Sequence, residues 1–212
     1  MGILKLIYES FVQMQRVNVV SRLLAQHIPH DSSVLDIGCG DGTLAASIMA
    51  SRKDLRIEGV DVMVRPSVHI HVREYDGLKL PFPDDSVDVA IFVDVLHHAE
   101  QPLAVLSEAA RVAGGKIIIK DHLRQGFMAQ TRLKMMDWMG NARYGVSLPY
   151  RYWTRSEWEK AFFECGLAEK TFLSGLRLYR FPLQWFFGGS LHFISVLDIK
   201  AKKESVVKSR GN

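Results

Sequence analysis

The residues with the clearest potential for chemistry form the run Asp36-Ile37-Gly38-Cys39-Gly40-Asp41-Gly42. The run follows Val34-Leu35, a short apolar segment typical of a buried strand, and precedes residues 43–50, which are good helix formers. Ligands of open α/β sheets bind beyond the carboxyl ends of the strands, and glycines let the backbone approach them without an intervening Cβ. The run therefore predicts a binding turn for a nucleotide-like ligand.

A second carboxylate, Asp61, supports this interpretation because it ends the next expected strand, about 20 residues further along the chain. A carboxylate in that place can accept hydrogen bonds from both hydroxyls of a ribose. The fingerprint for a dinucleotide would need a glycine where the chain has Thr43, and the turn lacks the lysine of a P-loop. The pattern favours a nucleoside ligand of another kind.

Apolar segments alternate with helical segments along the chain, which indicates an α/β fold with a mostly parallel sheet and helices on both faces. Strands are expected at 34–37, 57–61, 68–72, 87–93, 116–119, 168–181 and 191–199, with helices over 43–50 and 102–112. Thr154 and Glu157 form the pattern of a capping box, and Gly166 stands where a helix C-cap glycine belongs.

Length and composition favour one domain over residues 1–200, since 212 residues suffice for one substantial core. We expect a helical N-terminal segment at 1–30, a substrate-side insertion at 124–153 and a basic, disordered tail at 201–212. Cys39 and Cys165 lie in different settings and predict no disulfide framework. Neither a bilayer-spanning apolar run nor a signal peptide is evident, so the expected location is the cytoplasm.

Four motifs in order resemble those of the class I S-adenosylmethionine-dependent methyltransferases, in the branch that includes the quinone-biosynthesis enzymes. Residues 34–43 resemble the first motif, Asp61 the ribose-binding acid, Asp76-Gly77 with 80–83 the adenine-binding segment, and Asp88 with 94–98 the motif that ends the fourth strand. The resemblance covers residues 32–122.

The resemblance implies a doubly wound, seven-stranded sheet with an antiparallel final strand. The cofactor it implies is S-adenosyl-L-methionine, with S-adenosyl-L-homocysteine as product and the methionine end over the glycine turn. The cofactor contacts it implies are Asp36, Gly38, Cys39, Gly40, Gly42, Asp61, Val62, Asp76, Gly77, Asp94 and Val95.

Some of these assignments have a structural alternative. Asp36 either holds the glycine turn through backbone N–H groups or contacts the amino group of the cofactor. Asp76 precedes a glycine and could instead form a turn. Asp41 is expected to face solvent.

Methyl transfer from a sulfonium is an in-line displacement, so alignment and exclusion of water matter most, and a general base is optional. His97 and His98 are the nearest candidates for that base. The alternative is that one packs on the following helix while the other lines the pocket. Asp94, Asp121 and His122 resemble the ligand positions of metal-dependent catechol-type enzymes, but His122 replaces an asparagine, so no metal is expected.

The insertion at 124–153 combines methionines, aromatic residues and basic residues, which suits an apolar or aromatic ligand. Helical spacing predicts core packing for Leu133, Met136 and Met139, and Trp185 within 181–187 is expected to close the same pocket. We therefore expect transfer to an oxygen, carbon or nitrogen of a small hydrophobic or aromatic acceptor, free or lipid-linked. The rivals are a non-catalytic cofactor-binding scaffold and an RNA-directed methyltransferase that uses the basic tail; the missing Asn/Asp-Pro-Pro-Tyr motif argues against methylation of nucleic-acid bases.

Overall fold

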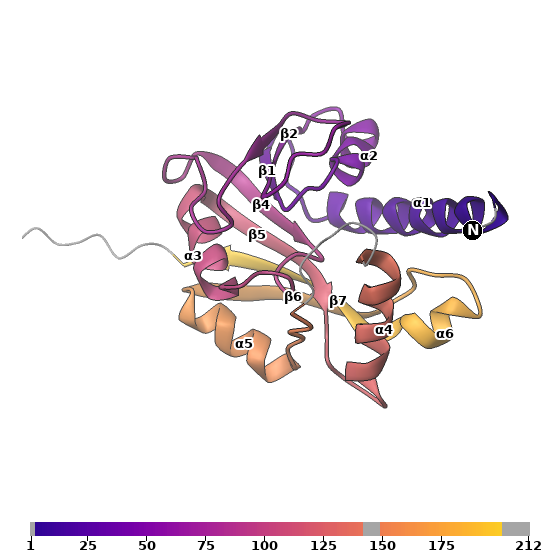
Figure 1. The fold of residues 1–212 in the computed structure, drawn as a ribbon. Helices are drawn as coiled ribbons and strands as arrows, with labels where there is room; N and C mark the ends of the chain where they lie inside the picture. The colour runs from indigo at the N-terminus through magenta and orange to yellow at the C-terminus, as the bar shows by residue number, and fades with distance from the viewer. Residues whose placement is uncertain (1–2, 142–148, 201–212) are drawn as a thin grey trace, which may run out of the picture.

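The structure is a computed structural model that describes residues 3–141 and 149–200 (Figure 1). The expected tail at 201–212 lies outside the described residues. The helices are α1 (Ile3–Ala25), α2 (Thr43–Ser51), α3 (Pro102–Val112), α4 (Ala129–Asn141), α5 (Arg155–Glu164) and α6 (Leu183–Phe187). The strands are β1 (Ser33–Ile37), β2 (Arg56–Asp61), β3 (Val72–Glu74), β4 (Val87–Val93), β5 (Ala113–His122), β6 (Leu167–Leu176) and β7 (Gly189–Ile199).

The seven strands form one sheet in the order β3-β2-β1-β4-β5-β7-β6. Neighbours from β3 to β5 pair in parallel, whereas β7 is antiparallel to both β5 and β6. This topology confirms the mostly parallel sheet with an antiparallel final strand. Because β1, β4 and β5 are parallel, the segments that follow them emerge at one edge of the sheet.

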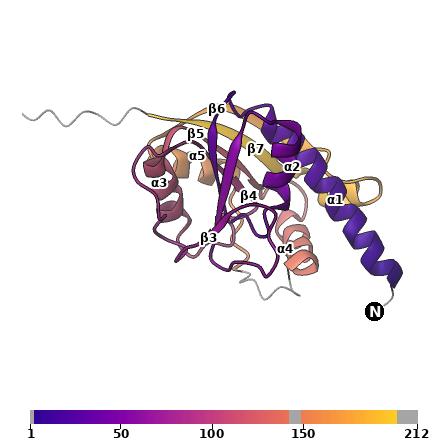
Figure 2. The same ribbon diagram turned by 90° about the horizontal axis from the view of Figure 1, so that it is seen from above.

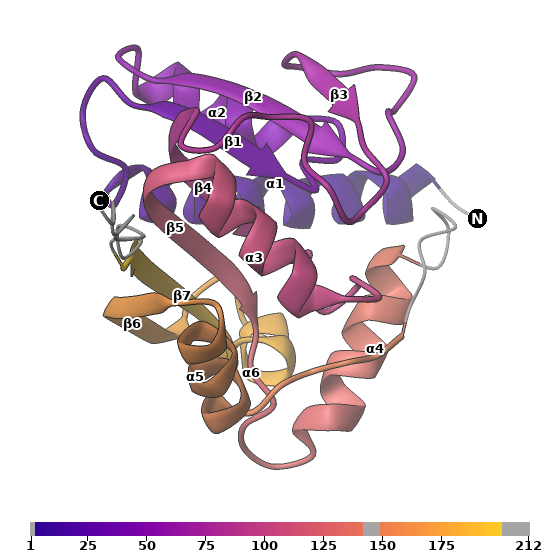
Figure 3. The same cartoon turned by 90° about the vertical axis from the view of Figure 1, so that its left-hand side faces the viewer.

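Helices cover both faces of the sheet, α1 and α2 on one and α3 and α5 on the other (Figures 2 and 3). The sequence of β4 is almost continuously apolar because the strand is covered on both faces. Ala90 and Phe92 pack into the core under α3 and α5, while Val89 and Ile91 pack into the core under α1 and α2. All four side chains are buried, as expected for a central parallel strand.

The expected strand at 68–72 is wrong, because the third strand lies at Val72–Glu74. The preceding segment passes over the glycine turn, where the backbone N–H of His69 donates to the carbonyl of Asp41 at 2.8 Å. Ile70 is its one buried side chain and packs against Gly42. The apolar and polar alternation therefore comes from one anchoring residue. The sixth strand also ends early, at Leu176.

The insertion forms α4, which lies beside α6 at the edge where β5 ends (Figure 1). Arg132 joins them, since its Nε donates to the carbonyl of Phe186 at 2.7 Å and its Nη2 to that of Trp185 at 3.2 Å. Leu133 is fully buried, as expected, and Met136 is partly buried. The prediction that Met139 packs in the core is wrong, because this residue is 57% exposed. No helix within residues 3–141 and 149–200 is long and apolar enough to cross a membrane.

The capping box at the start of α5 is confirmed and can be tested. The Thr154 hydroxyl accepts from the Glu157 N–H at 3.4 Å, and the Glu157 carboxylate accepts from the Thr154 N–H at 2.6 Å. Thr154→Ala should lower the free energy of unfolding by about 1 kcal/mol, as is usual for loss of an N-cap. Urea denaturation measures the change. Lys160→Ala, an exposed position on the same helix, is the control and should change it by less than about 0.5 kcal/mol. Equal effects of the two substitutions would contradict a capping role.

Candidate functional site

The turn after β1 needs glycine for two reasons. Gly38 and Gly40 both have positive φ, 73° and 61°, a conformation that other residues rarely adopt. A Cβ on Gly38 would also lie 2.5 Å from Cγ2 of Val95, in the segment that follows β4. The sequence thus allows the turn and the segment after β4 to approach each other closely.

Asp61 ends β2 and closes this turn. Its carboxylate accepts hydrogen bonds from the backbone N–H of Gly40 at 2.8 Å and of Met63 at 3.0 Å. The two bonds fix the carboxylate beside the glycines, as the sequence predicted. Each oxygen has a further lone pair, so the group keeps the capacity to accept from the hydroxyls of a ligand.

Asp36 lies buried under the turn, at the end of β1. Burial, and then the nearby charge of Asp61, raise the pKa of the Asp36 carboxyl to about 7. Burial likewise raises the pKa of the Cys39 thiol well above its usual range, so Cys39 is not a reactive nucleophile. A cation placed beside Asp36 would favour its ionised form.

Asp76 and Gly77 follow β3 and are near Val62. The Asp76 carboxylate accepts from the backbone N–H of Leu78 at 2.8 Å and of Lys79 at 2.7 Å, and these bonds lower its pKa. Asp76 therefore makes the turn that was its structural alternative, and one oxygen of its carboxylate carries both bonds. A Cβ on Gly77 would lie 3.2 Å from Cγ1 of Val62, whose side chain is 57% exposed. The exposed apolar surface next to Asp61 suits a flat heterocycle.

Asp94 begins the segment after β4 with a left-handed φ of 56°. Its carboxylate contacts the Lys120 ammonium at 2.5 and 2.8 Å and also pairs with Arg16 of α1. Against the cost of burial, these two cations hold the pKa of Asp94 well below its usual range. The structure brings Asp94 and Val95 to the glycine turn, but protein cations already engage the Asp94 carboxylate.

His97 and His98 have opposite electrostatics although they are adjacent. His97 is buried, and its Nδ1 lies 2.5 Å from Oδ1 of Asp121. Burial opposes the imidazolium, but Asp121 and Asp137 outweigh it and raise the pKa of His97 to about 10. Burial and the neighbouring His97 lower the pKa of the partly exposed His98 to about 4. At neutral pH the geometry favours a charged His97 and a neutral His98.

Asp121 and His122 end β5 and lie beside His97. The Asp121 carboxylate accepts from the backbone N–H of Leu96 at 3.1 Å and of His122 at 2.6 Å, in addition to its contact with His97. Nε2 of His122 lies 3.3 Å from Oδ1 of Asp137 in α4. We call His97, His98, Asp121, His122 and Asp137 the histidine–aspartate cluster.

We call this cluster, together with Asp94, Lys120 and His192, the buried polar region. Asp137, Lys120 and His192 were not identified from the sequence as members of a site. Asp137 accepts a hydrogen bond from the Tyr152 hydroxyl, and Nδ1 of His192 lies 3.2 Å from the Lys120 ammonium. Lys120 directly follows the apolar run Ile117–Ile119 of β5, His192 lies between Leu191 and Phe193 in β7, and Asp137 is the only acid in the sequence of α4. A charged or polar residue inside an apolar element is the signal that could have identified them.

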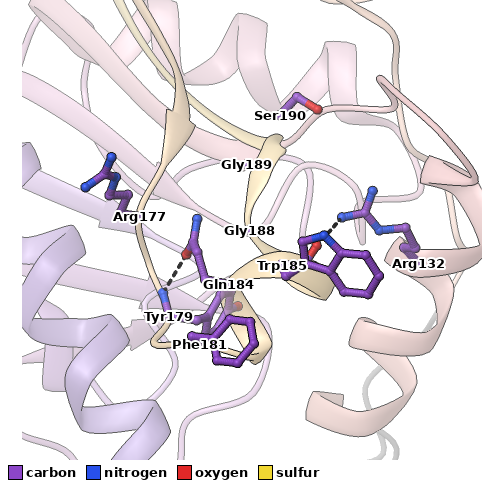
Figure 4. Close-up of a pocket in the computed structure, with 9 residues that line it drawn as sticks. All are labelled: Arg132, Arg177, Tyr179, Phe181, Gln184, Trp185, Gly188, Gly189 and Ser190. Carbon is purple, nitrogen blue, oxygen red and sulfur yellow. Dashed lines mark hydrogen bonds between the residues drawn. The ribbon is translucent and has the colours of Figure 1, made fainter.

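A pocket of about 580 Å³ lies beside this region, in the connection between β6 and β7 (Figure 4). Gln184 shapes it by accepting from the N–H of Tyr179 and donating to the carbonyl of Leu176, both at 3.0 Å. The Tyr179 ring lies 6.0 Å from that of His192, so the pocket wall borders the buried polar region. Residues of its lining are Arg132, Arg177, Tyr179, Phe181, Gln184 and Trp185. Trp185 thus lines this pocket together with Arg132 of α4, but none of the methionine or aromatic residues described within 124–153 lines it.

Comparison with known proteins identifies a methyltransferase family, in agreement with the resemblance of the sequence motifs. The family model described as "Methyltransferase domain" matches residues 8–169 of this chain. A curated relative, the 27-O-demethylrifamycin SV methyltransferase of Amycolatopsis mediterranei (strain S699), is 32% identical over 105 residues, which are 42% of this chain and 38% of the relative. The chain therefore spans less than half the length of that relative.

Solved structures show the same fold at low sequence identity. The SpnF protein, described as a 4+2 cyclase, superposes with a TM-score of 0.66 at 14% identity over 87% of this chain and 82% of its own. The geranyl diphosphate C-methyltransferase of Streptomyces coelicolor A3(2), solved with Mg²⁺, geranyl diphosphate and S-adenosyl-L-homocysteine, has a TM-score of 0.62 at 16% identity over 84% and 78% of the two chains. By sequence and by fold, this chain belongs to the class I S-adenosylmethionine-dependent methyltransferase family.

Proposed function

We propose that this chain transfers the methyl group of S-adenosyl-L-methionine to a small hydrophobic or aromatic acceptor, free or lipid-linked. The observation that carries the proposal is the closed glycine turn, in which Asp61 binds the N–H of Gly40 while Val95 contacts Gly38. This turn lies at the edge of the sheet where the buried polar region and the aromatic pocket also lie. Donor and acceptor sites would then share one edge.

The proposed donor site consists of the turn and the ends of β2 and β4. In it, Asp61 would accept from the ribose hydroxyls, and the exposed Val62 would pack against the adenine. Asp36 would compensate the ammonium of the methionine moiety. The proposed contacts are Asp36, Gly38, Cys39, Gly40, Gly42, Asp61, Val62, Asp76, Gly77 and Val95, with Asp94 acting through its ion pairs.

The names of two similar proteins support a small organic acceptor. The Amycolatopsis relative is a methyltransferase of 27-O-demethylrifamycin SV, and the Streptomyces structure is a C-methyltransferase of geranyl diphosphate. The SpnF structure, described as a 4+2 cyclase, is a reminder that this fold serves more than one reaction. The acceptor class therefore rests on the pocket, whose lining combines Tyr179, Phe181 and Trp185 with arginines.

The proposed mechanism relies on alignment. The bound cofactor supplies a methyl group on a sulfonium, which a nucleophile can displace in line. His97 is unsuited to act as a general base, because it is buried and Asp121 engages its Nδ1. His98 is partly exposed and neutral, so it remains the candidate base, although a pKa of about 4 makes it a weak one. The cluster would then position the segment after β4.

Cofactor binding can be tested through Asp61. The Asp61→Asn variant should bind S-adenosyl-L-homocysteine about 10- to 100-fold more weakly, because a hydrogen bond to a charged group is worth about 1.5 to 3 kcal/mol. Isothermal titration calorimetry measures the affinity. In a thermal-shift assay the cofactor product at 100 times its Kd should stabilise the wild type by about 2.7 kcal/mol, whereas NAD should not.

The matched control for this test is Asp41→Asn. Asp41 belongs to the same turn and is exposed, and its carboxylate accepts from the N–H of Thr43 at 2.9 Å. Its variant should keep the wild-type affinity. Wild-type affinity in Asp61→Asn, with an intact circular dichroism spectrum, would remove the ribose role.

The role of Asp36 predicts a pH dependence of cofactor affinity. Because burial raises the pKa of Asp36 to about 7, the carboxyl is mostly protonated at pH 6 and mostly ionised at pH 7.5. An ammonium beside it binds the ionised form better, so the affinity for S-adenosyl-L-homocysteine should rise about 8-fold between these pH values. Asp36→Asn should abolish the rise. A wild-type affinity that is independent of pH would mean that Asp36 only supports the turn.

Turnover separates an enzyme from a cofactor-binding scaffold. Labelled S-adenosyl-L-methionine, incubated with a panel of phenolic, terpenoid and lipid-linked acceptors, should give labelled product with the wild type. Phe181→Ser, which changes an exposed pocket residue, should raise KM for that acceptor more than it lowers kcat. Phe163→Ser, an exposed phenylalanine on α5, is the control. Cofactor binding without transfer to any member of the panel would favour the scaffold.

A further inference from the structure

The histidine–aspartate cluster brings together three side chains whose ligand atoms could hold one cation. His97, His98 and Asp137 each offer one ligand atom, and these atoms all lie within 4.8 Å of one another. Nε2 of His97 is 3.5 Å from Oδ2 of Asp137. Ligand atoms of a tetrahedral ion with bonds of about 2.0 to 2.1 Å lie about 3.3 to 3.5 Å apart, so this pair already has a suitable spacing.

One atom of the cluster lacks a hydrogen-bond partner within the described part of the chain. Nε2 of His97 is buried, and although Oδ2 of Asp137 lies 3.5 Å away, the two atoms form no hydrogen bond. The opposite nitrogen, Nδ1, lies 2.5 Å from Asp121 Oδ1, which is the arrangement found behind metal-binding histidines. A carboxylate in that position accepts a hydrogen bond from Nδ1–H, which fixes the ring and leaves the Nε2 lone pair directed away from Asp121. The buried Nε2 is thus prepared to act as a ligand.

The balance of charge also calls for a cation. Asp94 is neutralised by Lys120 and Arg16, but no lysine or arginine of the described residues forms an ion pair with Asp121 or Asp137. Among the described residues, histidines alone, His97 and His122, form the ion pairs of these two buried carboxylates. Buried charge is costly unless it is compensated, and a divalent ion placed here would compensate both carboxylates.

We propose that His97, His98 and Asp137 bind a divalent transition-metal ion, with Asp121 and Tyr152 holding two of the ligands in place. Two imidazoles and one carboxylate suit Zn²⁺, Fe²⁺ or Co²⁺, whereas Mg²⁺ and Ca²⁺ prefer oxygen ligands. The alternative group, Asp94 with His122 and His192, is a poorer site, because the Lys120 ammonium already lies between Asp94 and His192. Three protein ligands leave a position for water or for an acceptor oxygen.

This site differs from the catechol-type metal site that the sequence did not favour. The ligands of that site would have been Asp94, Asp121 and His122. In the structure, Asp94 pairs with Lys120, and Asp121 contacts His97. The metal proposal goes beyond methyl transfer and does not depend on it. It also has a consequence for the mechanism, since a metal-bound His98 would not serve as a base.

The test uses the full chain and measures metal content. The protein is first treated with a chelator and desalted. It is then titrated with Zn²⁺ or Co²⁺, and the bound metal is measured by inductively coupled plasma mass spectrometry. The wild type should retain about one ion per chain, show visible cobalt absorption bands, and melt at a higher temperature with zinc. His98→Gln and Asp137→Asn should lose affinity by more than about 100-fold, and Asp121→Asn by about 10- to 100-fold.

His71→Gln is the control for adventitious binding, because His71 is 69% exposed on the segment before β3. Affinity for S-adenosyl-L-homocysteine and circular dichroism verify that each variant is folded, and the partly exposed His98 keeps the test decisive if Asp137→Asn does not fold. The proposal is wrong if the wild type retains none of Zn²⁺, Co²⁺, Mn²⁺ and Fe²⁺. It is also wrong if His98→Gln binds metal as tightly as the wild type does, since the ion would then lie elsewhere.

Discussion

The ion pair between Asp94 and Lys120 is the interaction on which the rest of the site depends. It joins the end of β4 to the end of β5, and Arg16 extends it to α1. The backbone N–H of Asp94 also donates to the carbonyl of Lys120 at 2.8 Å, which fixes the left-handed turn. Breaking such a buried pair costs about 3 to 5 kcal/mol, because one charge is left without compensation. Everything that follows Asp94, including His97, takes its position from this turn.

The geometry of the proposed donor half of the site could be predicted from the sequence because local rules determine it. Positive φ values and close approach require the glycines at 38 and 40, and a strand that ends in an acid places Asp61 beside them. The seven strands and the antiparallel final strand followed from the family resemblance and not from periodicity. The third strand was misplaced because Ile70 alone anchors a loop, and a single buried residue can imitate the alternation of a strand.

The other half could be predicted only in part. His97, His98, Asp121 and His122 follow or end strands and were candidates from the sequence, whereas Asp137 and His192 join them only in three dimensions. Asp137 reaches His122 from α4, and His192 reaches Lys120 across the antiparallel pairing of β5 with β7. No spacing along the chain connects these residues. The sequence contained a weaker signal, since Lys120 and His192 directly adjoin apolar residues in their strands, and burial of such groups is rare unless they are paired.

The two halves are mechanically connected through one short segment. Val95 packs on Gly38 of the glycine turn, the next residue Leu96 donates its N–H to Asp121, and His97 contacts the same carboxylate. Three consecutive residues therefore join the donor turn to the histidine–aspartate cluster, and a shift at one end is passed to the other without a long path. Because Leu96 is fully buried, the segment has little freedom to absorb such a shift. A ligand that orders the cluster would therefore also order Val95, where the segment packs on the glycine turn of the proposed cofactor site.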